Sequence, residues 1–255
     1  LMAAKSDPGT MADNVERKVN FPNHPYGDIM TETTLANITR DEVVSYFQSI
    51  FTTQGSYLVI VGDITKDQAT KIVNQYFGKK SDKTPYKQEI GNGSMNTGNR
   101  VFFVKKPGAV QSVIQISFPM NIRTGDKNQL PLTVLNGIFG GNGFGTRLMQ
   151  NLREDKAYTY GCYSGLNITE DGSWISIGGN FRNEVTDSAI TQMLYELDSI
   201  TNSYVSDEEL NLTKSSMAGS FSRSLERPQT IAQFALNIIR NNLNKDYYQS
   251  YLKRL

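Results

Sequence analysis

The stretch GGNGFGTRLMQNLREDKAYTYGCYS, residues 140–164, combines a turn, a helix and a strand in direct succession. Its glycines predict the turn, because glycine adopts backbone angles that other residues avoid. Leu148 and Leu152 then stand four residues apart, which is the spacing of one helical face, and a tyrosine-rich run follows. The stretch therefore predicts a helix over 145–154 and a strand over 157–166.

The turn contains Gly140, Gly141, Gly143 and Gly145. A glycine-rich turn that leads into a helix can cradle an anion on its backbone N–H groups. This one lacks the Lys-Ser/Thr pair of a phosphate loop and does not match G-x-G-x-x-G. The sequence therefore argues against nucleotide binding and favours a turn where the backbone packs closely or hinges.

Outward from this stretch, strands and helices are grouped rather than alternating. In 111–119, Ile114, Ile116 and Phe118 alternate with polar residues, as in a strand with one buried face. The further strand patterns are 101–106 and 173–181, and the further helical patterns are 129–139, 184–202, 206–224 and 229–243. Grouping of this kind predicts the α+β class, with helices packed on an antiparallel or mixed sheet.

The first part of the chain repeats this mixture. Helical patterns cover 8–20, a segment that begins at Thr39, and 65–77, whereas YLVIVG at 57–62 predicts a strand buried on both faces. Capping boxes, in which Ser or Thr precedes Glu or Gln by three residues, mark three helix starts. The pairs are Thr39 with Glu42, Thr65 with Gln68, and Ser206 with Glu209.

Residues 81–100 lose all periodicity and are rich in Lys, Gly, Asn and Ser, which is the composition of a flexible linker. We therefore predict that 1–80 is the end of one domain and 101–255 most of a second. DPGTMADNV (7–15) and RPQTIAQFA (227–235) share Pro, Thr and Ala at matching positions. If this echo marks a repeated domain, the first copy lacks its beginning and the second its C-terminal end.

Composition excludes several classes of protein. The 26 Lys and Arg and 25 Asp and Glu leave a net charge of +1, so we expect no nucleic-acid partner. No apolar run reaches the ~20 residues of a membrane span. One cysteine, Cys162, excludes an internal disulfide, and one histidine, His24, excludes the common zinc sites with two or three histidines. In FPNHPYG, His24 is predicted to be a turn or capping residue rather than a base.

The block GGNGFGTRLMQNLREDKAYTYG resembles the second-domain signature of the insulinase/pitrilysin family of zinc peptidases. That signature is a Gly-Gly turn, S/T-R-L, L-R-E, and a tyrosine seven residues after the arginine, here Arg153 and Tyr160. Three further segments are similar to family features in the same order: HPYG (24–27), YLVIVGDIT (57–65) and SFSRSLERPQTIA (220–232).

The resemblance implies two homologous metallohydrolase-type domains of α+β architecture that close like a clamshell. In the family, the first domain binds zinc through H-x-x-E-H, and the second contributes the Arg/Tyr pair. Arg153 is then expected to anchor a peptide carbonyl or carboxylate, and Tyr160 to donate a hydrogen bond to the oxyanion. Tyr158, Gly140 and Gly141 are further candidates for substrate binding.

The chain departs from the family in having no H-x-x-E-H. We therefore expect no metal in this chain, and zinc in an upstream domain or a partner subunit of the same family. The wording LREDKAYTYG is similar to zinc-less, processing-peptidase-like partner subunits. The resemblance thus implies that the chain is part of a zinc metalloendopeptidase that cleaves peptides in a closed chamber. It also implies that this chain alone is inactive. A non-catalytic structural subunit is the alternative, and a bacterial periplasm or envelope is the expected location.

Overall fold

The computed structural model describes residues 1–78, 84, 98 and 100–255 of the protein. The chain forms two compact units, each described by itself. One contains Leu1–Ile29 and the described residues of 90–216, and the other contains the described residues of 30–89 and Met217–Leu255. The predicted linker 81–100 lies almost entirely outside the described residues. The division into 1–80 and 101–255 concerns the parent domains and stays a prediction.

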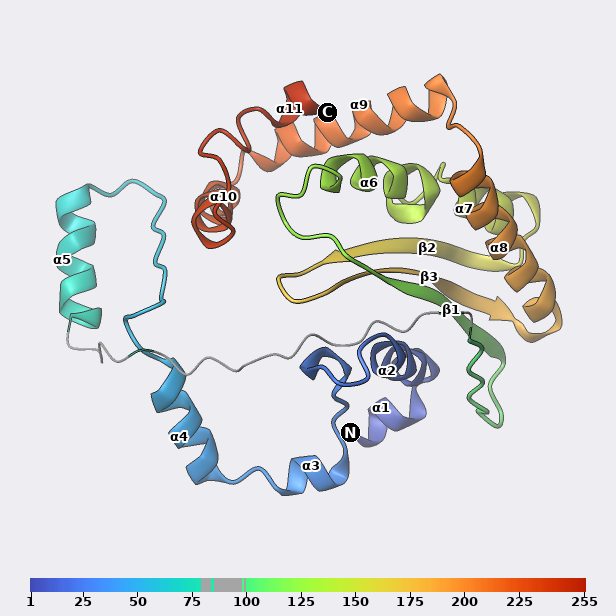
Figure 1. Ribbon diagram of the computed structural model, residues 1–255, viewed down its shortest axis with the longest axis horizontal. Coiled ribbons are helices and arrows are strands. Elements are labelled where there is room, and N and C mark those ends of the chain that lie inside the picture. Colours follow the sequence, from blue (N-terminus) through green and yellow to red (C-terminus); the bar gives the residue numbers. More distant parts are fainter. Residues whose placement is uncertain (79–83, 85–97, 99) are drawn as a thin grey trace. The chain divides into compact units, whose positions relative to one another are not determined.

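The first unit is built on a three-stranded antiparallel sheet. Its strands are β1 (Gln111–Met120), β2 (Thr159–Ile168) and β3 (Ser173–Arg182), in the order β1-β3-β2 (Figure 1). The central strand β3 pairs along its whole length with β1, from Gln111↔Arg182 to Met120↔Ser173. These strands confirm the predictions for 111–119, 157–166 and 173–181, and with them the α+β class.

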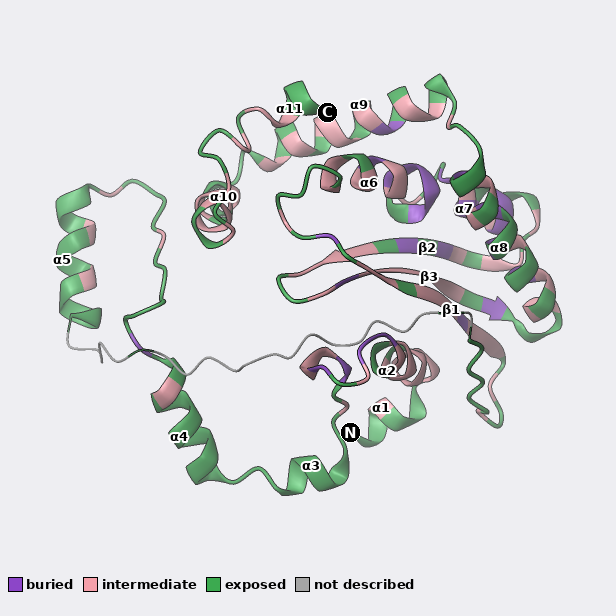
Figure 2. Ribbon diagram, viewed as in Figure 1, coloured by how far each residue is buried: buried purple, intermediate pink, exposed green. Residues whose placement is uncertain are grey.

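Helices cover both faces of this sheet. α6 (Gln129–Asn136), α7 (Arg147–Met149) and α8 (Thr186–Asn202) lie on one face, and α2 (Pro8–Asn20) packs on β1 from the other (Figure 1). The strand residues beneath α6–α8 are mostly apolar and stand at every second position, so their side chains point to the same side. The buried apolar ones are Ile114, Cys162, Ile177 and Phe181, and they form the sheet side of the core of this unit (Figure 2).

Local capping chemistry sets the helix starts. Thr39 begins α4 (Arg40–Ile50) and Thr65 begins α5 (Lys66–Phe77), each with the reciprocal hydrogen bonds of a capping box. Proline opens both α2 and α10 (Pro228–Arg240), where its missing N–H costs nothing, so both halves of the sequence echo start a helix. The remaining α-helices are α1 (Met2–Ser6), α3 (Glu32–Ala36), α9 (Asp207–Ser224) and α11 (Tyr251–Arg254).

Two strand predictions are wrong. Residues 57–62 and 101–106 belong to no strand, and Tyr57, Leu58, Ile60 and Val61 are exposed (Figure 2). None of the N–H groups of 57–61 donates a backbone hydrogen bond to another described residue. A β-prone sequence becomes a strand only when a neighbouring strand supplies hydrogen bonds, and the described part of the chain offers neither segment such a neighbour.

His24 is confirmed as a capping residue. It precedes the 3₁₀ turn η1 (Pro25–Gly27), and its Nδ1 accepts a hydrogen bond of 3.1 Å from the Tyr26 backbone. The ring is buried between Phe21 and Tyr26. This single histidine therefore has a local structural role and is closed off from solvent.

Candidate functional site

Residues 142–146 form a loop, called the glycine loop below, and a π-helical segment lies on each side of it in the chain. α6 continues into η2 (Gly137–Gly141), the chain turns, and α7 continues into η3 (Gln150–Asp155). The sequence patterns at 129–139 and 145–154 had predicted ordinary helix here. π-Helical turns are rare and occur often at functional sites, because the extra residue redirects the side chains that follow.

Two kinds of constraint explain the glycines. Gly140 is buried, and a Cβ there would lie 2.6 Å from Leu148 Cδ1 and 2.7 Å from the Ser164 nitrogen. Gly143 and Gly145 instead adopt φ of +78° and +83°, angles that favour glycine. Gly140 thus allows close packing, whereas the other two allow the loop to reverse.

At the tip of this loop, Phe144 folds back over Arg153. The Arg153 Cζ lies 4.5 Å from the centre of the Phe144 ring, within the range of a cation–π contact. The ring is nevertheless 73% exposed. Arg153 Nε also lies 3.6 Å from a carboxylate oxygen of Glu154. Phe144 was not predicted from the sequence, although a large aromatic residue among four glycines was a signal for it.

A strained turn and a β-bulge place Tyr160. Ala157 has φ of +51°, in the left-handed region that non-glycine residues seldom occupy, and its N–H donates to the Arg153 carbonyl at 3.0 Å. The β2–β3 register then shifts between Thr159 and Cys162. Bulges re-aim side chains, and Tyr160, inside this one, is 89% exposed.

The structure places the two predicted residues on elements that contact each other. Arg153 lies on η3 and Tyr160 on β2. Tyr160 makes no side-chain hydrogen bond or ring contact within the described residues, and the terminal nitrogens of Arg153 donate no hydrogen bond there. Tyr158 is half-buried, and Gly141 is held against Asn136. The Tyr160 hydroxyl and the terminal nitrogens of Arg153 are therefore available to a ligand.

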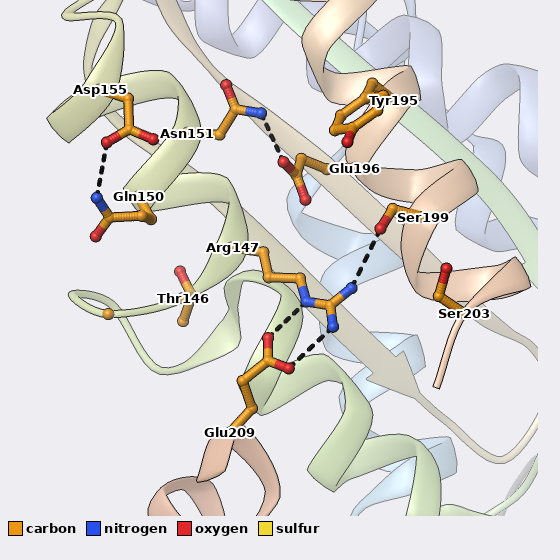
Figure 3. Close-up of a pocket in the computed structure, with 11 residues that line it drawn as sticks. Thr146, Arg147, Gln150, Asn151, Asp155, Tyr195, Glu196, Ser199, Ser203 and Glu209 are labelled. Carbon is orange, nitrogen blue, oxygen red and sulfur yellow. Dashed lines mark hydrogen bonds and ion pairs between the residues drawn. The ribbon is translucent and has the colours of Figure 1, made fainter. Parts of the chain in front are cut away.

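A separate cavity of about 410 Å³ surrounds Arg147 (Figure 3). Arg147 donates to both carboxylate oxygens of Glu209, at 2.7 and 3.0 Å, and to Ser199 Oγ at 3.4 Å. Neither Arg153 nor Tyr160 lines this cavity. The lining residues are Gly145, Thr146, Arg147, Gln150, Asn151, Asp155, Tyr195, Glu196, Ser199, Ser203 and Glu209.

Arg147 and Glu209 form an ion pair in this cavity. The hydrogen bonds from Arg147 lower the pKa of Glu209 to about 2, and Glu209 in turn raises the pKa of Arg147. Glu196 accepts a hydrogen bond of 2.6 Å from Asn151. Arg147 thus fastens α7 to the start of α9 and to α8, which is a structural role that spacing alone did not reveal.

The candidate site does not fit a metal ion. Its functional side chains are a guanidinium, a phenol and a phenyl ring, none of which is a zinc ligand. Across the described ranges, no three His, Cys, Asp or Glu side chains gather as a metal site would require. What the arrangement offers is hydrogen-bond donors beside an exposed aromatic ring.

The elements that carry the candidate site match a known protein family. A family model described as "Peptidase M16 inactive domain" matches residues 37–217, which include the whole glycine loop, η3 and β2. The chain belongs to the peptidase M16 inactive domain family. The resemblance to insulinase/pitrilysin-type zinc peptidases is therefore confirmed, and this M16 domain is of the inactive type.

Relatives of this M16 domain include an uncharacterized zinc protease, YmxG, of Bacillus subtilis. It is 26% identical over 223 residues, which cover 86% of this chain and 52% of the relative. The chain thus spans about half the length of that relative. A solved M16 inactive domain from Pseudomonas fluorescens superposes with a TM-score of 0.86 at 22% identity, over 99% of this chain and 60% of that one.

The fold also occurs in a multisubunit assembly. A chain of complex III2 from Candida albicans gives a TM-score of 0.79 at 11% identity, over 99% of this chain and 61% of that one. At this identity the likeness shows the fold alone. No helix among the described residues has the length and hydropathy needed to cross a membrane.

Proposed function

We propose that this M16 domain is the substrate-side half of a zinc metalloendopeptidase, with the zinc carried by another domain or subunit of the same family. The chain then holds a peptide within a closed chamber and supplies no metal ligand. The observation that carries the proposal is a pair of accessible donors on contacting elements, the Tyr160 hydroxyl and the terminal nitrogens of Arg153, which donate no hydrogen bond to a described residue. By the family resemblance we also propose a bacterial periplasmic or envelope location.

Arg153 suits the anchoring of a peptide. Its side chain is about one-third exposed, at 32%, so it is restrained yet reachable. A guanidinium offers planar N–H donors in a fixed fork, which can hold a peptide carbonyl in one orientation. In the proposed complex Arg153 fixes the substrate backbone beside the reacting carbonyl.

Tyr160 suits the stabilisation of developing charge. Its hydroxyl has no partner within the described residues, so it gives up no internal hydrogen bond when a substrate arrives. In the proposed complex this phenol would donate a hydrogen bond to the oxyanion that develops on the scissile carbonyl, while the zinc-bearing domain or subunit would supply the activated water. Removing one such donor from an enzyme typically costs about 100- to 1000-fold in kcat.

The second candidate is a non-catalytic structural subunit. The inactive-domain description of the matching family and the occurrence of the fold in complex III2 favour it. A scaffold needs no arginine or tyrosine side chain that binds substrate, so the two functions differ in what Arg153 and Tyr160 do.

The test uses the chain mixed with a zinc-bearing M16 subunit from the same source, and an internally quenched peptide. Arg153→Ala is expected to raise KM, and Tyr160→Phe to lower kcat by about 100-fold. The matched controls are Arg123→Ala and Tyr204→Phe, since both residues are exposed and lie outside the site. Cleavage rates that are the same in all four variants would overturn the substrate role and support the scaffold.

A further inference from the structure

We propose that Phe144 is a specificity-determining residue, which selects peptides with an aromatic or large aliphatic side chain next to the carbonyl held by Arg153. This inference rests on the proposed function, because it assigns a second contact to the same peptide site.

The geometry of the stack leaves Arg153 free to bind. The Arg153 Cζ lies over the Phe144 ring at 4.5 Å, and the terminal nitrogens of Arg153 donate no hydrogen bond to a described residue. Guanidinium N–H bonds lie in the plane of the group, so a ring on its face leaves the donors at its edge open. Phe144 therefore restricts the motion of Arg153 and costs it no hydrogen bond.

The ring itself offers a second contact. Phe144 is 73% exposed although it already packs against Arg153, so most of the ring faces solvent. The loop that presents it is held in place, since Thr146 Oγ1 donates to the Gly143 carbonyl at 2.9 Å. Covering this ring with an apolar side chain of a bound peptide removes exposed aromatic surface from water.

Local charge narrows the class of peptide further. Glu154 lies 3.6 Å from Arg153 Nε. This carboxylate offsets the positive charge of the guanidinium and repels a second anion that approaches it. The anchored group is therefore a neutral backbone carbonyl, and acidic side chains at the neighbouring position are disfavoured.

The experiment measures binding of dye-labelled peptides to the full chain by fluorescence anisotropy. Three peptides of equal length differ only at a central phenylalanine, alanine or glutamate. The wild type is expected to bind the phenylalanine peptide about fivefold more tightly than the alanine peptide, and the glutamate peptide most weakly. Phe144→Ala is expected to bring the phenylalanine-to-alanine ratio to about one.

The controls separate this inference from the proposed function. Phe103→Ala removes another exposed phenylalanine, 87% exposed, and is expected to keep the wild-type ratio. Arg153→Ala is expected to weaken all three peptides. If Arg153→Ala does so while Phe144→Ala keeps the ratio, the specificity role of Phe144 is overturned and the proposed function stands. If Arg153→Ala weakens none of them, the proposed function fails.

Discussion

At position 140 the chain has room for a hydrogen atom and for no carbon. The Cβ of an alanine would lie 2.6 to 2.8 Å from Leu148, from the Ser164 backbone and from Ser164 Oγ. Because two of these neighbours are fixed in the core, Gly140→Ala is expected to lower the free energy of unfolding by about 1–3 kcal/mol, as overpacking does. Urea denaturation followed by circular dichroism measures the loss.

Gly165→Ala is the matched control in the same unit. Its added Cβ would meet only Asn167 Nδ2, at 3.9 Å, which is an ordinary contact. This variant is expected to unfold within about 0.5 kcal/mol of the wild type. Equal unfolding midpoints for Gly140→Ala and Gly165→Ala would contradict the packing role of Gly140.

At the scale of elements, the Arg147–Glu209 ion pair joins α7 to α9. Glu209 has a pKa lowered to about 2 by Arg147, below its ordinary value of 4.5. A carboxyl with a lowered folded pKa stabilises the protein above its unfolded pKa, and the stabilisation is lost as pH falls toward the folded value. The wild type is therefore expected to lose stability between about pH 4.5 and pH 2 from this group.

Glu209→Gln removes this dependence. The variant is expected to be less stable than the wild type at pH 7 and to approach it below about pH 2, where Glu209 of the wild type is protonated and both side chains are neutral. Glu208→Gln changes the neighbouring exposed carboxyl and is expected to leave the pH profile unchanged. Thermal melting across this pH range is the measurement, and a constant gap between Glu209→Gln and wild type would contradict the ion-pair account.

The sequence predicted those elements whose signals are local. The capping boxes at Thr39 and Thr65 marked two helix starts, because the same four residues contain both partners of the cap. Residues 57–62 could not be predicted in this way, since a strand depends on neighbours distant in sequence. The Phe144–Arg153 stack was also out of reach, because it requires the positive φ angles of the loop. Arg153 and Tyr160 were predicted from the resemblance to a family motif, because periodicity and spacing alone did not distinguish them from structural residues.

At the scale of the whole molecule, backbone protection is distributed unevenly. β3 pairs with a strand on each side, whereas the N–H groups of 57–61 donate no backbone hydrogen bond within the described part of the chain. Amide hydrogen exchange measured by mass spectrometry is expected to be slowest in β3 and unprotected in 57–61. Slow exchange in 57–61 of the isolated chain would contradict this description of the segment.

Cys162 lies in the well-protected sheet, so its reactivity depends on whether the sheet is closed. The thiol is fully buried in the core beneath α6–α8, and burial raises its pKa to about 12, so it is neither reachable nor ionised in the folded sheet. It is also the one cysteine in the sequence. A maleimide dye can therefore react only with molecules whose sheet has opened. The rate at which the dye attaches therefore measures how often the sheet opens, and no cysteine has to be introduced for this measurement.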